Sequence, residues 1–279
     1  MASTQTTSRR TFGLIGTGAI GGLVLDAFES GRLPYDRAIV FARTRRPSIE
    51  ARVLRVGGAV VDDLDALIAA RPAVVLEAAG HEAVRTYALR IVKSGLNLIL
   101  MSIGALADET IRTPLEGIAR QQGATVWLPS GGVGGLDALA AARALGDLER
   151  VTHRTTKHPQ GLNTAPYVVE GGLLREPLTE PIVIYRGPAR EALQHFPQNV
   201  NVAAAVSLAG IGFDRTQVEI VADPSALRSV HEIHAEGRFG AFTLRFENAM
   251  DPVNPRTSRL AGLSAVAALQ RRHGVFRFT

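Results

Sequence analysis

The sequence predicts an α/β protein, with an N-terminal doubly wound parallel sheet and a second α/β domain built on a mixed sheet. Three observations support this. Short apolar runs alternate with helical stretches up to about residue 128, a glycine-rich turn follows the first run, and longer strand-like stretches follow a second glycine-rich segment. Continuous apolar strands that alternate with helices are typical of a parallel sheet covered on both faces.

The first part of the chain contains five apolar runs and four helical stretches in alternation. Gly31 and Gly95 follow two of these helices, where a left-handed C-terminal cap is expected. The predicted strands are 12–15, 38–41, 74–76, 96–100 and 125–128, and the predicted helices are 19–30, 63–70, 82–93 and 108–121.

The pattern changes after Leu128. A glycine-rich connection at 129–135 leads into an alanine-rich helix, and the strand-like stretches that follow indicate a mixed or antiparallel sheet. A last helix is too apolar to stand alone and must pack on one of the domains. The predicted helices are 136–145 and 258–272, and the predicted strands are 151–156, 182–185, 217–222, 230–235 and 239–247.

Composition excludes several classes of function. The chain has no cysteine, so disulfides, thiolate catalysis and cysteine-based zinc sites are ruled out, and we predict no metal site. No run approaches the ~18–20 apolar residues of a membrane helix, and the first ten residues lack the apolar stretch of a secretory signal. We therefore expect no membrane association and a cytoplasmic location. The net charge is +5, but the basic residues are scattered and only 5% of residues are aromatic, which favours an anionic small molecule over nucleic acid.

The first glycine-rich turn, residues 16–21, has the spacing G-x-G-x-x-G. It follows an apolar strand and opens a helix, which is the context of a Rossmann-type dinucleotide site. Gly16 permits the tight turn, Gly18 lets the backbone approach a pyrophosphate, and Gly21 lets the helix lie close to the sheet. Ala19 and Ile20 begin the helix, whose free N–H groups attract phosphate. The alternative is a loop whose glycines serve packing alone.

The second strand ends in Arg43, Arg45 and Arg46 with no acidic residue. An NAD-selective site wants Asp or Glu there, whereas arginines suit a 2′-phosphate. We therefore expect NADP or NAD to bind, with NADP slightly favoured; the alternative is a solvated charged loop. The resulting domains are a tail at 1–10, a dinucleotide-binding domain at 11–130, a substrate and dimerisation domain at 131–255, and a C-terminal segment at 256–279 that can pack back on the first domain.

Further motifs with recognisable residue patterns lie along residues 12–272. They are Glu77-Ala78-Ala79-Gly80-His81, Met101-Ser102-Ile103-Gly104-Ala105-Leu106, Leu128-Pro129-Ser130-Gly131-Gly132-Val133-Gly134-Gly135-Leu136-Asp137, Phe196-Pro197-Gln198-Asn199-Val200-Asn201-Val202-Ala203-Ala204, Ala222-Asp223-Pro224, Val230-His231-Glu232-Ile233 and Asn254-Pro255-Arg256-Thr257-Ser258. Together with the glycine turn, and in this order along the chain, these motifs resemble those of the L-aspartate dehydrogenase family.

The resemblance implies a homodimeric enzyme that interconverts aspartate with iminosuccinate, or oxaloacetate plus ammonia, using NAD or NADP. It implies that His231 is catalytic and that Asn201 and Gly132 contact the cofactor. We also assign Gly80 to the cofactor site. Where the family often has Arg-Lys-Pro-Pro, this chain has Thr155-Thr156-Lys157-His158-Pro159. The family often has alanine at the position of Gly132, and we expect that change to be tolerated.

Chemical reasoning narrows the candidates but leaves His231 and His234 equally possible, and only the resemblance selects His231. Hydride transfer to an imine needs a proton-handling group near nitrogen or the carbinolamine oxygen, and histidine titrates near neutral pH. His231 and His234 are three residues apart in one strand, so they face opposite sides and only one can serve. We assign Asn199, Lys157 and His158 to the substrate. Asn199 and Asn201 share a face if their segment is extended. His81 either reaches the cofactor edge of the sheet or caps the next helix.

Two other functions remain open at this point. One is an oxidoreductase of the homoserine dehydrogenase or dihydrodipicolinate reductase type. The other is a regulatory protein that senses NADP and performs no chemistry, which would not need His231. The sequence leaves open whether the enzyme would serve pyridine nucleotide biosynthesis or aspartate breakdown.

Overall fold

The computed structural model describes residues 10–44, 46–175, 177–197, 201–251, 254, 257–272 and 275. Contacts group the described residues into two units. The first lies within Met1–Leu100, Thr113–Trp127 and Ala265–Arg277, and the second within Met101–Arg112 and Leu128–Ser264. These bounds differ from the expected 11–130, 131–255 and 256–279, because residues 101–112 group with the second unit. One reason is that the Gly104 N–H donates to Asn201 Oδ1 at 2.9 Å.

The first unit is built on a six-stranded sheet of order β3-β2-β1-β4-β5-β6, in which every neighbouring pair is parallel. The strand order reverses between β1 and β4, which is the topological switch point where α/β proteins bind ligands. This arrangement confirms the predicted doubly wound sheet. The strands are β1 Thr11–Ile15, β2 Arg37–Phe41, β3 Ala59–Val61, β4 Val74–Glu77, β5 Leu98–Leu100 and β6 Val126–Trp127.

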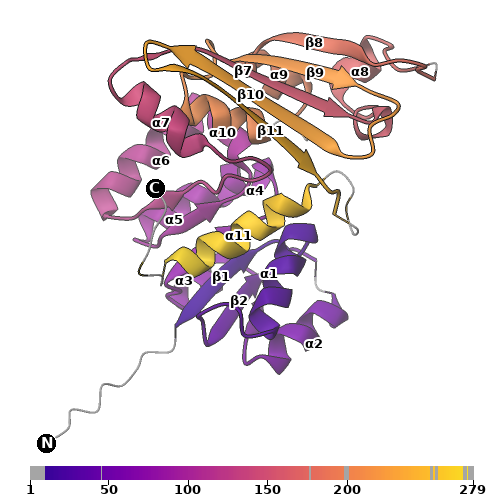
Figure 1. Cartoon of the computed structure of the whole chain (residues 1–279). Helices are drawn as coiled ribbons and strands as arrows, with labels where there is room; N and C mark the ends of the chain where they lie inside the picture. Colours follow the sequence, from indigo (N-terminus) through magenta and orange to yellow (C-terminus); the bar gives the residue numbers. More distant parts are fainter. Residues whose placement is uncertain are drawn as a thin grey trace, which may run out of the picture. The chain divides into compact units, whose positions relative to one another are not determined.

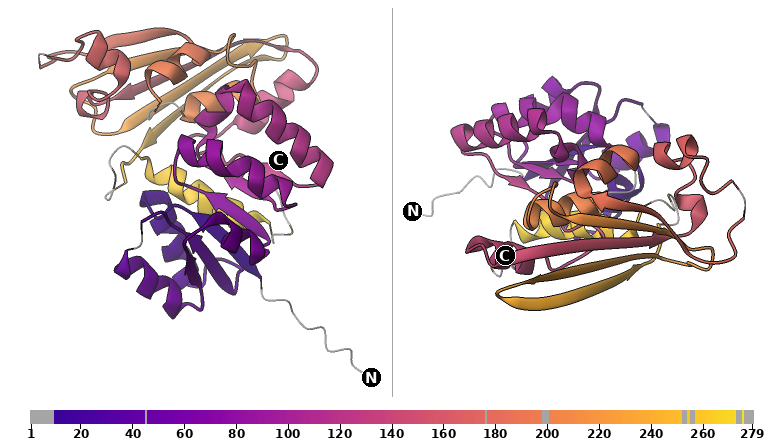
Figure 2. Two further views of the ribbon diagram at one scale, coloured as in Figure 1. Left: turned by 180° about the vertical axis from the view of Figure 1, so that it is seen from behind. Right: turned by 90° about the horizontal axis from the view of Figure 1, so that it is seen from above.

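Helices cover both faces of this sheet, and Figures 1 and 2 show α4, α5 and α6 on the side opposite α1. Right-handed crossovers require this separation. The later part of α11 joins the first unit, where Gln270 Nε2 donates to Arg32 O at 2.9 Å. The helical elements are α1 Ala19–Glu29, α2 Pro47–Arg55, α3 Leu64–Ala69, α4 His81–Ala83, the π-helical turn η1 Val84–Ala88, α5 Leu89–Lys93, α6 Glu109–Gln122 and α11 Arg259–Arg271.

The second unit is built on a five-stranded sheet of order β11-β10-β7-β9-β8. Only β7 and β9 pair in parallel, so the sheet is mixed as predicted. Helices α7 Leu136–Ala144 and α10 Asn201–Ala209 cover one face, where Leu139 and Val206 pack against Val151 and Ile233 (Figure 1). The strands are β7 Leu148–Lys157, β8 Ile182–Pro188, β9 Gln217–Ala222, β10 Ser229–Gly237 and β11 Gly240–Asn248.

The sequence did not predict several short elements. These are α2, β3, the 3₁₀ turns η2 Ile103–Ala107 and η3 Pro159–Gly161, α8 Pro166–Glu170, α9 Ala189–His195 and α10. The condition under which Asn199 and Asn201 would share a face, an extended segment, is not met at Asn201, because this residue begins helix α10. Asn199 lies outside the described residues. The left-handed caps are confirmed, with φ of 69° at Gly31 and 77° at Gly95. Within the described residues, no helix combines the length and apolar character needed to cross a membrane.

Candidate functional site

The glycine-rich turn between β1 and α1 has the backbone that its spacing predicts. Gly16 has φ of +98°, and a Cβ there would lie 2.6 Å from Ala78 O. At Gly21 a Cβ would lie 2.2 Å from Gly16 O, so this glycine lets α1 start against the turn itself. Gly18 is the N-cap of α1, no side chain caps the helix there, and a Cβ would meet nothing within 4 Å. The start of α1 therefore offers backbone N–H groups and open space, which fits a dinucleotide pyrophosphate.

A second turn, after β4, lies against the first. Ala78 N donates to Ile15 O at 2.8 Å. Glu77 is 2% exposed, and its Oε1 accepts from Ala79 N at 2.7 Å and from Gly80 N at 2.9 Å. Gly80 has φ of +116°, a conformation that favours glycine. The buried carboxylate of Glu77 thus holds the turn that contains Gly80, a role that the sequence pattern did not reveal.

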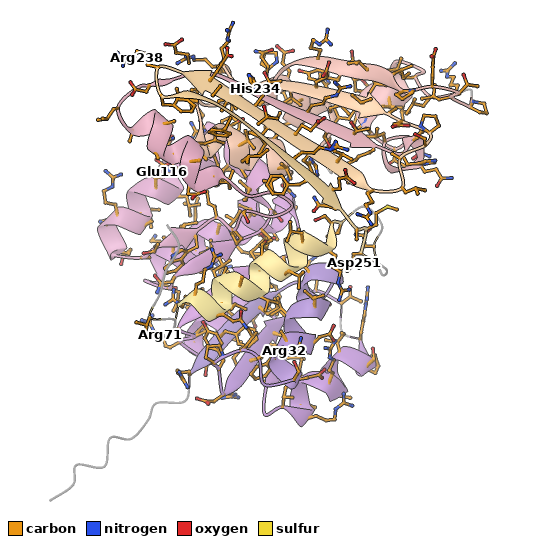
Figure 3. All side chains as sticks on the ribbon, in the orientation of Figure 1. Arg32, Arg71, Glu116, His234, Arg238 and Asp251 are labelled. Atoms are coloured by element: carbon orange, nitrogen blue, oxygen red, sulfur yellow. The ribbon has the colours of Figure 1, made fainter. Side chains whose placement is uncertain are left out.

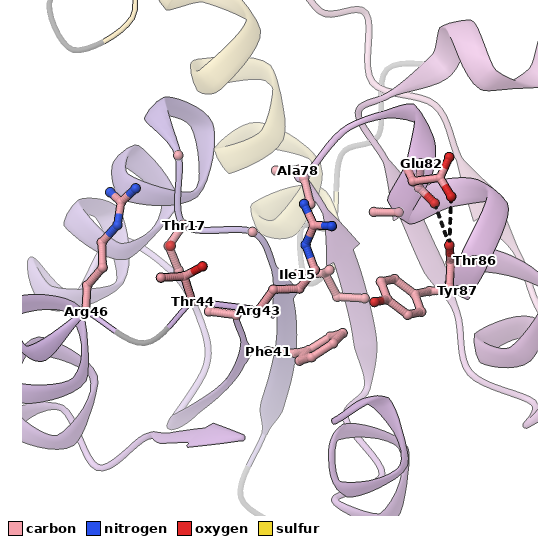
Figure 4. A pocket seen from close by; sticks show the side chains of 15 residues that line it. Ile15, Thr17, Phe41, Arg43, Thr44, Arg46, Ala78, Glu82, Thr86 and Tyr87 are labelled. Atoms are coloured by element: carbon pink, nitrogen blue, oxygen red, sulfur yellow. Dashed lines mark hydrogen bonds between the residues drawn. The ribbon is translucent and has the colours of Figure 1, made fainter. Parts of the chain in front are cut away.

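A pocket of about 330 Å³ opens at the carboxyl ends of β1, β2 and β4 (Figure 4). Gly16 and Gly18 line it together with Arg43, Thr44 and Arg46, whereas Arg45 lies outside the described residues. Thr86 and Tyr87 of the π-helical turn line the opposite side, and Arg43 extends from the end of β2 toward Ala78 in Figure 4. Two guanidinium groups and a hydroxyl are thus gathered where a ribose 2′-phosphate would be read.

In the second unit, the two histidines of β10 face opposite sides of the sheet, as predicted. His231 is 4% exposed and shares the helix-covered face with Ile233 and Ala235. His234 lies on the other, exposed face, where Nδ1 is 3.0 Å from Thr243 Oγ1 (Figure 3). Of the two histidines, His231 is therefore the buried one.

His231 lies beside two other buried basic side chains, both from β7. Its partner across the strand pair is Thr155, and Nδ1 of His231 lies 3.2 Å from Nε2 of His153. Burial first, and then the neighbouring His153 and Lys157, hold the pKa of His231 well below its usual value. Burial lowers the pKa of Lys157 to about 8, and burial with the nearby Lys157 charge lowers that of His153 to about 3. The imidazoles of His153 and His231 are therefore uncharged near pH 7, and the pKa of the Lys157 amine is about 8.

These shifts make the fold sensitive to acid. An unfolded histidine takes up a proton near pH 6.5, whereas folded His153 stays neutral down to about pH 3. Between about pH 6.5 and pH 3 the unfolded state therefore binds more protons than the folded state. As the pH is lowered through this range, His153 should reduce the free energy of unfolding by up to about 1.4 kcal/mol per pH unit. Urea unfolding at several pH values within this range measures it. We expect a shallower slope for His153→Leu than for the exposed control His234→Leu; equal slopes would contradict the assignment.

A second pocket, of about 690 Å³, opens where β7 ends and β10 begins. Lys157 and His158 line it, together with Arg228 and Ser229 just ahead of His231, and none of the described residues that line it carries a carboxylate. His158 Nδ1 also accepts from Gln160 N at 3.3 Å, which caps η3. The pocket therefore brings together two of the predicted substrate residues and adds Arg228, which the sequence analysis did not single out. His231 is not among its lining residues.

The predicted contact residues Gly132 and Asn201 both have structural partners in the second unit. Gly132 O accepts from the buried Asn248 Nδ2 at 2.7 Å, and Asn201 Oδ1 holds Gly104 N. A Cβ on Gly132 would lie 3.1 Å from Asn248 Nδ2 and 3.2 Å from Ser258 Oγ. The expected tolerance of alanine there thus requires these side chains to move by a few tenths of an ångström.

The remaining predicted residues are only partly gathered. Ala19 and Ile20 begin α1 beside the phosphate turn, as expected. His81 is the first residue of α4, but the N-cap is Gly80 and His81 does not line the first pocket. Among the described residues, no cluster of three or more His, Asp or Glu side chains could hold a metal ion.

A doubly wound domain with a dinucleotide turn, joined to a mixed-sheet domain with a buried histidine, is the architecture of a nicotinamide-dependent oxidoreductase. Two family models match the chain: "Homoserine dehydrogenase, NAD binding domain" at residues 16–129 and "Aspartate dehydrogenase, C-terminal" at residues 137–272. The L-aspartate dehydrogenase of Methanosarcina acetivorans is 42% identical, covering 93% of this chain and 95% of that protein. That of Ruegeria pomeroyi is 40% identical, covering 95% and 93%. The chain belongs to the aspartate dehydrogenase family.

Solved structures agree with this assignment. The crystal structure of aspartate dehydrogenase from Thermotoga maritima superposes with a TM-score of 0.78 at 27% identity, covering 98% of this chain and all of that one. A hyperthermophilic archaeal homoserine dehydrogenase in complex with NADPH reaches 0.57 at 10% identity, over 97% of this chain and 99% of that one, which shows a shared fold only.

Proposed function

We propose that this protein is an NAD(P)-dependent L-aspartate dehydrogenase, which interconverts L-aspartate with iminosuccinate, or oxaloacetate plus ammonia. The observation that carries the proposal is the pocket in the second unit. Lys157, His158 and Arg228 line it, and none of its described lining residues carries a carboxylate. The buried His231 lies two positions after Ser229 on β10. A pocket of this charge suits a dicarboxylate.

Cofactor binding, substrate binding and proton transfer are assigned to different groups of residues. The nicotinamide supplies the redox chemistry when it is bound, and the protein contributes position and electrostatics. The glycine turn and Arg43 would hold the phosphates, with Gly80, Gly132 and Asn201 as further contacts. Lys157, His158 and Arg228 hold the carboxylates, and the predicted Asn199 joins them. His231 handles the proton at the carbinolamine oxygen or the imine nitrogen.

The direct test is a spectrophotometric assay. The protein is mixed with a reduced nicotinamide cofactor, oxaloacetate and ammonium, and loss of the reduced-cofactor absorbance is followed. We expect turnover that requires both oxaloacetate and ammonium. Turnover with aspartate semialdehyde instead would favour the homoserine dehydrogenase alternative. Binding of NADPH without turnover of either substrate would favour the regulatory alternative.

We propose further that NADP binds at least as well as NAD. The support is the pair Arg43 and Arg46, with Thr44 between them, in the lining of the first pocket. A charge-assisted hydrogen bond contributes about 1.5–3 kcal/mol, so the double variant Arg43→Ala/Arg46→Ala should lose about ten-fold or more in NADPH affinity. Its NADH affinity should change far less. Fluorescence titration of both cofactors measures the ratio, and the exposed Arg238→Ala is the control; an equal loss for both cofactors would contradict a 2′-phosphate site.

Arg228 gives a separate test of the substrate pocket. We expect Arg228→Leu to raise KM for oxaloacetate by about ten-fold, because a charge-assisted hydrogen bond to one carboxylate is lost. The cofactor Kd should be unchanged. Arg238, at the other end of β10, is a matched control because it pairs with Asp147 instead. If Arg238→Leu raises KM as much, the effect is one of overall charge and not of the pocket.

The predicted homodimer and the cytoplasmic location belong to the same proposal. They rest on the family resemblance. Light scattering coupled to size-exclusion chromatography measures the oligomeric state, and a single species of monomer mass would contradict the homodimer.

A further inference from the structure

His153 is a buried histidine that the chemistry proposed above does not use. It lies on β7, directly opposite Ile233 of β10, while His231 lies opposite the neighbouring position Thr155. Both imidazoles therefore lie on the helix-covered face of one sheet. His153 is 1% exposed, and its closest polar partner is the Nδ1 atom of His231 at 3.2 Å.

The two rings meet edge to edge. Their planes differ by 20° and their centroids are 5.4 Å apart. That separation exceeds the distance between Nε2 of His153 and Nδ1 of His231 by roughly the sum of two ring radii, so both nitrogens lie nearly on the line that joins the ring centres. A proton on either nitrogen then points at the lone pair of the other, which is the geometry of a straight N–H···N hydrogen bond.

The surroundings of His153 decide which nitrogen carries the proton. In the described part of the chain, His153 Nδ1 is buried and has no hydrogen-bond partner. A proton on Nδ1 would be a buried donor without an acceptor, which folded proteins avoid more strictly than an unused lone pair. The proton of neutral His153 therefore belongs on Nε2. Burial and the neighbouring Lys157 oppose a doubly protonated ring, in agreement with the lowered pKa of His153.

The consequence falls on His231. If Nε2 of His153 donates, Nδ1 of His231 must accept, and the proton of neutral His231 is then on its own Nε2. Within the described residues, the contact with His153 is the one hydrogen bond that the side chain of His231 makes, so Nε2 is left to a substrate. A ring fixed in this way presents an N–H group and not a lone pair.

We propose that His153 is a positioning residue that holds His231 in the tautomer protonated on Nε2, so that His231 meets the substrate as a hydrogen-bond donor. The proposal rests on the proposed function in one respect, the catalytic role of His231. In that role, the Nε2 proton is directed at the carbinolamine oxygen, where it stabilises the negative charge that develops on this oxygen as the C–O bond breaks and the imine forms.

The tautomer can be observed without any turnover. In full-length protein labelled with ¹⁵N-histidine, two-bond ¹H–¹⁵N correlations distinguish a protonated Nε2 from a protonated Nδ1, and the His231 signals are identified by their loss in His231→Gln. We expect His231 with proton on Nε2 and Nδ1 as an acceptor. A proton on Nδ1 of His231 overturns the proposal, whether or not the protein oxidises aspartate.

Two variants at one position then separate positioning from packing. His153→Leu removes the donor, whereas His153→Gln keeps an amide N–H that can reach Nδ1 of His231. We expect His153→Leu to lower kcat by about ten- to a hundred-fold, the range typical of lost support behind a working histidine, with little change in cofactor Kd. His153→Gln should recover most of that loss and keep the wild-type tautomer.

The control is His234→Gln, on the exposed face of the same strand, which should change neither the tautomer nor kcat. If His153→Leu leaves the His231 spectrum unchanged, or if folded His153→Gln is as slow as His153→Leu, His153 is a packing residue and the proposal is wrong. If the wild-type protein shows the expected spectrum but no turnover of oxaloacetate, the proposed function fails and the tautomer assignment stands.

Discussion

Replacing His231 by glutamine should lower kcat for reductive amination of oxaloacetate by about 10²–10⁴-fold, the contribution typical of a positioned proton-handling group. Glutamine retains volume at a position that is 4% exposed, so it opens less of a cavity than alanine would. Because the first pocket lies wholly within the first unit, the Kd for cofactor should stay within about two-fold. Steady-state kinetics and fluorescence titration measure the two quantities.

His234→Gln is the control for this prediction. It shares the strand, but its side chain contacts Thr243 and Glu236 on the exposed face. We expect wild-type kcat for it. Loss of activity in His234→Gln together with normal activity in His231→Gln would reverse the assignment. Normal activity in both would move the proton-handling role to Lys157, whose pKa of about 8 also lies near neutrality.

The parts of the fold that could be predicted are those in which one periodicity dominates. Strands β1, β2 and β4 are nearly unbroken apolar runs, because both faces of a parallel sheet are buried. Strand β3 has three half-buried residues, and the missed helices α8 and α9 have five and seven residues. Segments this short carry too little periodic signal to be told from loops.

The site divides in the same way. The glycine spacing and the alternation of His231 and His234 are local, so the sequence could predict the turn and the two opposite faces. The pairing of His153 with His231 spans 78 residues and depends on the register between β7 and β10. The roles of Glu77 and Arg228 likewise depend on contacts that only the folded chain makes. In a sequence, an isolated charged residue is interpreted as a solvent-exposed one.

The last prediction compares three glycine-to-alanine changes, at Gly16 and Gly18 of the dinucleotide turn and at Gly22 inside α1. Gly16→Ala should both destabilise the protein and abolish measurable cofactor binding. Its φ of +98° is strained for alanine, at about 1–3 kcal/mol, and the new Cβ would lie 2.6 Å from Ala78 O and 2.9 Å from Ala79 Cα. All of these neighbours are backbone atoms, so the β4 turn would have to move, and with it the hydrogen bond from Ala78 N to Ile15 O.

Gly18→Ala and Gly22→Ala separate the two effects. At both positions a Cβ meets nothing within 4 Å and φ is not in the left-handed range, so the fold should tolerate alanine. At Gly18 the methyl group would occupy the space in front of the N-terminus of α1, and affinity for NAD and NADP should fall about ten- to a hundred-fold without loss of stability. At Gly22, inside α1, alanine should raise the free energy of unfolding by about 0.5–1 kcal/mol and leave cofactor affinity unchanged.

Urea unfolding and cofactor titration on the three variants give the comparison. Unchanged affinity in Gly18→Ala would mean that the phosphates do not approach the start of α1, since nothing else in the surroundings of that glycine opposes a side chain.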